Sequence, residues 1–214
     1  MNNKITTDQL IYLNEAAKAL KQKSFQICNN YMIGIDNIDS YIAYLELDYA
    51  KVYGIPLNGA IINARELSAF IKTITVESEF ILEDHNKDGV YTISTVLATL
   101  VIDNRIRCRF GESASNSIYT VERIRMQDVL SPCRCVNNEL EKIFSYHKQD
   151  GCMYYIHDGR YFITLFAGLL PLNKADKIYL TIYEDSDNSF IAEFKIDKKK
   201  FTVYVYVAYL YIKR

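Results

Sequence analysis

The sequence predicts an α+β fold built on antiparallel sheets. In most of the chain apolar and polar residues alternate, which is the pattern of strands with one buried face. Three segments instead repeat their apolar residues at helical spacing, near residues 8–21, 64–74 and 138–148. Short turn-forming stretches separate the strands, and such connections favour hairpins over the long crossovers of a parallel sheet.

The N-terminal part begins with a predicted helix from Asp8 to Lys21, which Thr6 or Thr7 can cap. Lys18 lies opposite its apolar face. We expect three strands next, at residues 25–28, 32–35 and 41–49, with Asn-rich turns between them. The apolar face of the helix consists of Leu10, Leu13, Ala17 and Leu20.

A second helix is predicted from Ala64 to Ile74, with Asn63 as its cap. Arg65 and Lys72 are seven residues apart and lie away from its apolar face. Strands are expected after it at residues 79–83, 90–94, 97–102, 105–110 and 118–126. The apolar residues of this helix are Leu67, Phe70, Ile71 and Ile74.

The third predicted helix, Asn138 to Lys148, restarts the order of elements and is followed by hairpins up to residues 201–212. Lys142 lies on its outward side. A restarted order indicates two structural repeats without a residue-level period. We therefore expect a first domain over residues 1–126, a connector over 127–135 that contains Ser131-Pro132, and a second domain over 136–214.

Composition limits the classes of function. The 214 residues carry a formal net charge of −1, so affinity for nucleic acid requires a local basic surface. There is no N-terminal signal-like segment and no apolar run long enough for a bilayer, so we expect a soluble, intracellular protein. Five cysteines without a secretory signal favour free thiols. Many Lys, Asn, Ile and Tyr residues are typical of AT-rich viral or bacterial genomes.

Two stretches resemble metal sites, and neither is favoured. "DHNKDG", Asp84 to Gly89, matches the start of a calcium loop, but Thr95 stands where the bidentate Glu is needed, which favours a hairpin turn. The side chains available for zinc have an unusually tight Cys-x-Cys spacing and include a histidine on an apolar face, which favours buried thiols. These are Cys133, Cys135, His147, Cys152 and His157. We predict no metal and no cofactor.

No catalytic motif is present: there is no nucleophile elbow, phosphate-binding glycine loop or HExxH sequence. Asp36 and Asp39 have no histidine near them in sequence, and we interpret them as turn formers that cap local amides. The sequence therefore predicts a protein that is not an enzyme.

The outward helix faces carry the remaining signal. Lys18, Lys21, Arg65, Lys72 and Lys142 place cations away from the apolar faces of three helices. On each helix alone, a solvated face with cations near the C-terminus explains the pattern. Three helices with the same pattern in a near-neutral chain favour a surface that binds phosphates without sequence preference.

Four segments resemble the DNA sliding clamps, the family of proliferating-cell nuclear antigen and the phage polymerase clamps. "GIDNIDSYIAYLEL" is similar to a hairpin of the clamp, "INARELSAFIKTI" to its second helix, and "SIYTVERIRMQDV" to the edge strand before its connector. "DKIYLTIYEDSDNSFIAEFKI" with "FTVYVYVAYLYIKR" resembles its terminal hairpin and last strand. The second domain is abbreviated relative to the family, because Pro171 interrupts the segment where a fourth helix belongs.

The resemblance implies two clamp-like domains with sheets outside and helices on the inner face. It implies a viral, homotrimeric processivity factor for DNA replication or an accessory factor for transcription, located in the host cytoplasm or at the site of viral replication. Its expected partners are duplex DNA, a peptide of a DNA polymerase or transcription factor, and a clamp loader, with no membrane. The peptide pocket carried over by position consists of Ile35, Ile42, Val129, Leu130, Tyr206 and Ala208.

Two alternatives remain open at this point. A viral protein–protein adaptor with the clamp fold but no ring would explain the missing helix. A β-rich structural protein unrelated to clamps would leave the helix faces simply solvated.

Overall fold

The structure is a computed structural model that describes residues 4–34, 41–57, 59–76, 79–85, 90–103, 129–135, 144–147, 152–157, 161–166, 176–184 and 190–209. The chain divides into two compact units. Unit 1 comprises residues 1–36 and 44–118, and unit 2 comprises residues 37–43 and 119–214. The expected boundaries at 126 and 135 stay a prediction, since residues 104–128 and 136–143 lie outside the described part.

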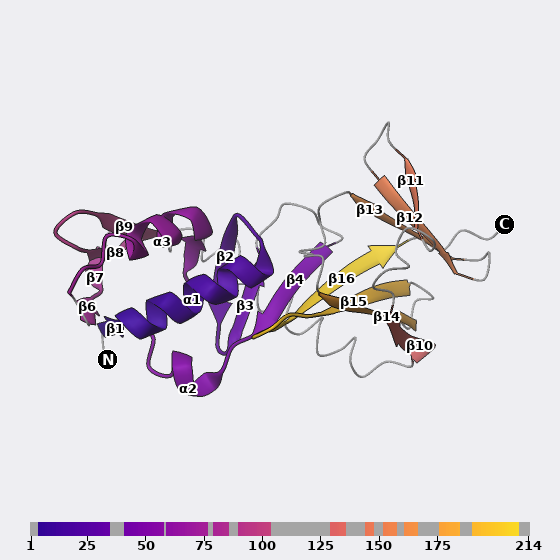
Figure 1. The fold of residues 1–214 in the computed structure, drawn as a ribbon, viewed down its shortest axis with the longest axis horizontal. Coiled ribbons are helices and arrows are strands. Elements are labelled where there is room, and N and C mark those ends of the chain that lie inside the picture. Colours follow the sequence, from indigo (N-terminus) through magenta and orange to yellow (C-terminus); the bar gives the residue numbers. More distant parts are fainter. Residues whose placement is uncertain are drawn as a thin grey trace. The chain divides into compact units, whose positions relative to one another are not determined.

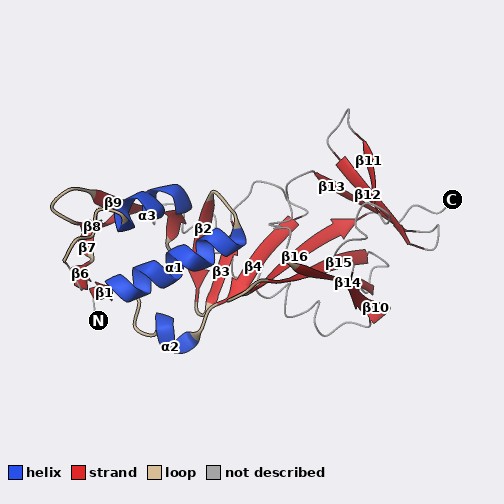
Figure 2. Cartoon of the chain, viewed as in Figure 1, coloured by secondary structure: helices blue, strands red, loops and turns tan. Residues whose placement is uncertain are grey.

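Unit 1 combines helices with antiparallel strands, as predicted. Along the chain its elements are β1 (Lys4–Thr6), α1 (Thr7–Leu20), β2 (Ser24–Cys28), β3 (Tyr31–Gly34), β4 (Tyr41–Glu46), α2 (Tyr49–Val52), β5 (Ile61–Asn63), α3 (Ala64–Ile71), β6 (Glu79–Ile81), β7 (Glu83–His85), β8 (Val90–Ser94) and β9 (Thr99–Asp103). The three helices and their surrounding strands are shown in Figure 2. β4 begins in residues assigned to unit 2.

The strands of unit 1 form one sheet in the order β4-β3-β2-β5-β9-β8-β7 and a separate pair, β1-β6. Every pairing in it is antiparallel. Two expected strands, 105–110 and 118–126, lie outside the described residues. β7 and β8 pair with His85 opposite Val90, which confirms that strands rather than helices flank "DHNKDG".

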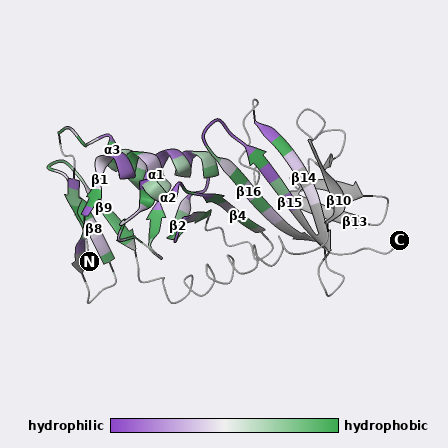
Figure 3. Ribbon diagram, turned by 90° about the horizontal axis from the view of Figure 1, so that it is seen from below, coloured by the Kyte–Doolittle hydropathy of each residue, from purple (hydrophilic) through white to green (hydrophobic). Residues whose placement is uncertain are grey.

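The α1 helix begins where the sequence predicts. The Thr6 hydroxyl accepts a hydrogen bond from the Gln9 amide at 3.2 Å, and the Gln9 side chain accepts one from the Thr6 amide at 3.0 Å. This reciprocal pair satisfies two amides that have no partner inside the helix. Leu10, Leu13 and Leu20 are fully buried, which confirms the predicted apolar face. Figure 3 shows hydrophilic and hydrophobic residues interspersed along α1 and α3, as expected of amphipathic helices.

The core of unit 1 lies between these helices and the strands. Phe70 of α3 and Phe80 of β6 pack edge-to-face with ring centroids 5.6 Å apart. Helices α1 and α3 lie side by side (Figure 1). The largest fully buried side chains of this unit are Tyr44, Phe25, Phe70, Ile5, Leu10, Leu13, Leu20, Met32, Leu45, Leu57 and Ile62.

Unit 2 is described as strands only. A four-stranded antiparallel sheet has the order β10-β14-β15-β16, and a second sheet has the order β11-β12-β13. The bounds are β10 Val129–Cys135, β11 Phe144–His147, β12 Cys152–His157, β13 Tyr161–Phe166, β14 Lys177–Glu184, β15 Phe190–Asp197 and β16 Thr202–Tyr209. The side chains of Phe194, Ile196, Val203 and Val205 are fully buried, so alternate residues of β15 and β16 form its core.

The predicted third helix is wrong where the structure describes it. Residues 144–147 form β11, which pairs with β12 from Phe144 opposite Tyr155 to His147 opposite Cys152. Phe and Tyr favour strands. The antiparallel pairing with β12 also provides the backbone hydrogen bonds that a helix would have formed internally. A short apolar stretch fits both the helical and the strand period, so its spacing alone could not distinguish a helix from a strand. Residues 136–143, with Lys142, lie outside the described part.

Candidate nucleic-acid interface

The end of α1 and the beginning of α3 meet at one place in unit 1. β2 follows α1 and pairs with β5, so that Ser24 lies opposite Asn63. The Ala64 amide, the first of α3, donates a hydrogen bond to the Lys23 carbonyl at 3.0 Å. Residues 39 and 41 positions apart in sequence are thereby held as neighbours, which brings the cations at the end of α1 close to the first turn of α3.

Asn63 fixes the start of α3. Its side-chain oxygen accepts hydrogen bonds from the amides of Arg65 at 2.9 Å and Glu66 at 3.1 Å. Leu67 and Phe70 then face the core, whereas Arg65 and Lys72 are exposed. The outward direction predicted for both cations is confirmed. With a rise of 1.5 Å per residue, they lie roughly 10 Å apart along the helix.

Lys21 ends α1 in the left-handed conformation, with φ 55° and ψ 28°. Its amide donates to the Ala17 carbonyl at 2.9 Å, which closes the last turn. Lys18, Lys21 and Lys23 are all exposed. Together with Arg65 they form a group of four cations, which we call the cationic junction.

Within the described residues, Lys18, Lys23, Arg65 and Lys72 make no ion pair. The surrounding faces are not uniformly basic, however. Asp8 and Glu66 are also exposed, and α1 presents the apolar Ile11 at 40% exposure. Glu66 lies next to Arg65 in the first turn of α3, so one carboxylate accompanies the cations of the junction. The sequence predicted the cations near the end of α1 and those of α3 as separate groups, and the Lys23–Ala64 hydrogen bond brings the two groups together.

The predicted peptide pocket is described only in part. Ile42 is half-buried on β4, and Tyr206 is 2% exposed on β16. Val129 and Leu130 lie in β10 and Ala208 in β16, where the structure describes the backbone; Ile35 lies outside the described residues. Residues 129–135 of the expected connector are thus a strand, paired with β14. The pocket itself stays a prediction.

The candidate metal ligands are divided between two sheets. Cys133 and Cys135 belong to β10, whereas His147 and Cys152 are opposite each other in the β11–β12 ladder. In the described part of the chain, no group of three or more His, Cys, Asp or Glu side chains is arranged to hold a metal ion. Asp36 and Asp39 lie outside that part. No helix in it is long and apolar enough to cross a membrane.

No protein-family model matches the sequence, and no curated protein matches it. Solved structures similar to the chain include DNA polymerase III beta subunits and a PCNA. One is assigned as a DNA polymerase III beta subunit from Eubacterium rectale, with a TM-score of 0.46 and 10% identity. The match covers 99% of this chain and 65% of the beta subunit. A second is the A. fulgidus PCNA bound to the C-terminal region of FEN-1 (TM-score 0.41, 11% identity), with 99% of this chain and 98% of that chain covered.

The DNA polymerase III beta subunit of Pseudomonas aeruginosa is similar at a TM-score of 0.40 and 10% identity over 100% of this chain. The chain thus spans about 65% of the length of the bacterial beta subunits that it matches.

Proposed function

We propose that this protein is a sliding-clamp-like processivity factor, which tracks duplex DNA without sequence preference and tethers a polymerase or the transcription machinery. The observation that carries the proposal is the cationic junction of Lys18, Lys21, Lys23 and Arg65, with Lys72 further along α3. Exposed cations held by two helices packed side by side suit contacts to phosphates. The clamp resemblance of the four sequence segments supports the same function. A non-catalytic role is part of the proposal.

The position of Arg65 is the strongest part of this argument. Cations near a helix C-terminus, such as Lys18, are stabilised by the helix dipole, and helix stability alone explains them. Arg65 instead occupies the first turn of α3, at the positive end of the dipole, where a cation is unfavourable by about 0.3–1 kcal/mol. Its exposed side chain also contributes nothing to the core. Binding of a phosphate would explain an arginine at this position, whereas the stability of the fold does not.

The mechanism requires contacts that are weak and mobile. Phosphate contacts from Lys and Arg carry no sequence information and exchange readily along a duplex. Successive phosphates of one strand rise by about 3.4 Å along the axis, so the roughly 10 Å between Arg65 and Lys72 corresponds to about three nucleotides.

Tethering requires a second contact, to a peptide of the polymerase or transcription partner. We retain Val129 and Leu130 as the residues to test. Leu130→Asp is expected to abolish binding of the partner peptide while the fold and the DNA affinity are kept. An unfolded variant would instead make Leu130 a core residue. The homotrimeric ring, the clamp loader and the viral origin belong to this proposal as well.

Two measurements test the function. Fluorescence anisotropy with two duplexes of unrelated sequence is expected to give affinities within about twofold of each other, because phosphate contacts dominate. Retention on closed circular DNA, followed by loss when the circle is cut, would support encirclement, and a trimeric mass in solution would accompany it. A monomer that binds neither duplex would contradict the proposal and favour the ring-less adaptor.

A further inference from the structure

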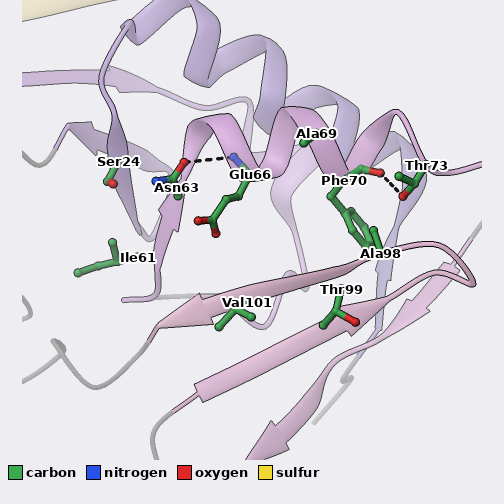
Figure 4. A pocket seen from close by; sticks show the side chains of 10 residues that line it. All are labelled: Ser24, Ile61, Asn63, Glu66, Ala69, Phe70, Thr73, Ala98, Thr99 and Val101. Atoms are coloured by element: carbon green, nitrogen blue, oxygen red, sulfur yellow. Dashed lines mark hydrogen bonds between the residues drawn. The ribbon is translucent and has the colours of Figure 1, made fainter.

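An open groove of about 630 Å³ lies in unit 1 between α3 and β9. Figure 4 shows Glu66, Ala69 and Phe70 of the helix above it and Thr99 and Val101 of the strand below it. Ser24, Ile61 and Asn63 line one end, and Thr73 and Ala98 line the other. Its lining thus combines apolar surface with a few polar groups, the composition of many binding sites.

Among the described residues, one edge of the strand wall of the groove is unpaired over most of its length. β9 pairs with β8 over its whole length, from Ser94–Thr99 to Val90–Asp103. On its other side, the described pairing with β5 is limited to Ile61 opposite Asp103. Residues 99–102 therefore have no strand partner on that side among the described residues. In an antiparallel strand every second residue directs its amide and carbonyl to such an edge, which is available to another strand.

The two walls are held firmly. Asn63 fixes the first turn of α3, as described above. At the other end, the Thr73 hydroxyl donates to the Phe70 carbonyl at 2.7 Å and lies 3.1 Å from the Thr95 hydroxyl, which joins the helix end to the β8–β9 turn. A groove with rigid walls loses little conformational entropy when a ligand binds.

Glu66 gives the groove its charge. The side chain points from α3 into the space above β9 (Figure 4). Its backbone amide is used by Asn63, but its carboxylate makes no ion pair within the described residues. Val101, which is 47% exposed, provides apolar surface on the opposite wall. A ligand that fits must therefore offer backbone hydrogen bonds, small apolar side chains and one cation.

We propose that this groove binds an extended peptide segment of a partner protein, which pairs with the open edge of β9 and places a lysine or arginine beside Glu66. The four residues 99–102 span about 13 Å, which suits a peptide of four to six residues. A second copy of the chain fits less well, because α3 forms the other wall and leaves no room for a neighbouring sheet. The groove is lined by residues other than those of the cationic junction and of the predicted pocket at Val129 and Leu130.

The probe is a fluorescein-labelled hexapeptide of alternating valine and threonine with one central lysine. Two control peptides carry glutamate in place of the lysine, or N-methyl groups on alternate amides that remove the ladder hydrogen bonds. We expect saturable binding of the lysine peptide and at least tenfold weaker binding of both controls. Hydrogen exchange of alternate amides in residues 99–102 is expected to slow when the lysine peptide is added.

Variants locate the binding. Glu66→Gln is expected to weaken binding of the lysine peptide roughly tenfold, because a charge-assisted hydrogen bond is lost. Glu83→Gln changes an exposed glutamate outside the groove and is the matched control, which should leave binding unchanged. Ala69→Arg fills the groove and pairs with Glu66 three residues earlier, so binding is lost without harm to the helix. Ala50→Arg on α2 is its control.

Four results would overturn the proposal. These are no saturable binding of the lysine peptide, equal binding of the N-methylated peptide, exchange at residues 99–102 that is already slow without peptide, and self-association of the protein that Ala69→Arg abolishes. The third result would mean that the chain itself covers the edge, and the fourth that a second copy does.

Discussion

Glu193 and Tyr206 lie opposite each other in the β15–β16 ladder, and the Tyr206 hydroxyl donates a hydrogen bond to the Glu193 carboxylate at 2.5 Å. Their residues are only 7% and 2% exposed. A buried carboxylate is stable when it has such a partner and costly when it has none. Tyr206 is therefore buried in unit 2, and the peptide pocket to which the sequence assigned it stays a prediction.

Tyr206→Phe is expected to destabilise the protein by about 1–3 kcal/mol, because it leaves the Glu193 carboxylate buried without this hydrogen bond. Chemical denaturation measures the change. Tyr206→Phe combined with Glu193→Leu is expected to recover part of the loss, since both polar partners are then removed. A stability unchanged by Tyr206→Phe alone would show that the hydrogen bond contributes nothing.

Asn63→Ala is expected to cost about 1 kcal/mol, because the amides of Arg65 and Glu66 lose their acceptor at the start of α3. Asn63→Asp retains the oxygen and is expected to keep most of the stability. Thermal unfolding of the three proteins measures this. Equal losses for both variants would mean that the cap does not hold α3. The Asn63→Ala variant should also weaken DNA binding, since Arg65 lies in the turn that the cap orders.

Tyr12 is expected to make the stability sensitive to alkali. Burial raises the pKa of its phenol above the ordinary value of 10.0, and the charges of Asp48 and Glu15 add to this, while the hydrogen bond from the Asp48 amide opposes it. The Tyr12 phenol thus keeps its proton up to a higher pH in the folded state than in the unfolded chain. This contribution is complete below pH 10 and is lost as pH rises through the folded-state pKa.

The free energy of unfolding of wild type and Tyr12→Phe, measured from pH 8 to pH 11, tests this expectation. The difference in the free energy of unfolding between the two proteins should narrow above pH 10, because deprotonation of the tyrosine then destabilises the folded wild type. The variant also lacks the 2.8 Å bond that the Asp48 amide donates to the phenol oxygen, which costs about 1 kcal/mol at neutral pH. A difference that stays constant over this range would contradict the assignment.

The sequence predicted those elements whose local signals agree. Thr6 and Asn63 mark the starts of α1 and α3 through their own side chains, and the apolar spacing that follows them is long enough to be helical. The segment around Phe144 also had helical spacing, but its pairing with β12 decided in favour of a strand. Three-residue strands such as β5 are too short to show an alternation of apolar and polar residues, so the sequence pattern does not predict them.

The candidate site could be predicted only residue by residue. Exposed cations on helix faces follow from periodicity, which identified Arg65 and Lys72. Their grouping with Lys23 depends on a backbone hydrogen bond between residues 41 positions apart, and no local pattern encodes it. The burial of Tyr206 likewise depends on Glu193 of the neighbouring strand, so its two-residue spacing from Ala208 could not distinguish a pocket from the core.

The most direct test of the proposed DNA tracking is the salt dependence of duplex binding by wild type and by the double variant Arg65→Glu with Lys72→Glu. Both positions are exposed, and glutamate is favoured at the first turn of α3 but disfavoured at its end, so thermal stability should be nearly unchanged. Lys177→Glu with Lys199→Glu, also at exposed positions, serves as the matched control. We predict that the slope of log K against log salt becomes shallower by roughly two and that affinity falls at least tenfold at low salt, because two phosphate contacts are lost. Affinity and slope equal to wild type in a folded double variant would contradict the proposal.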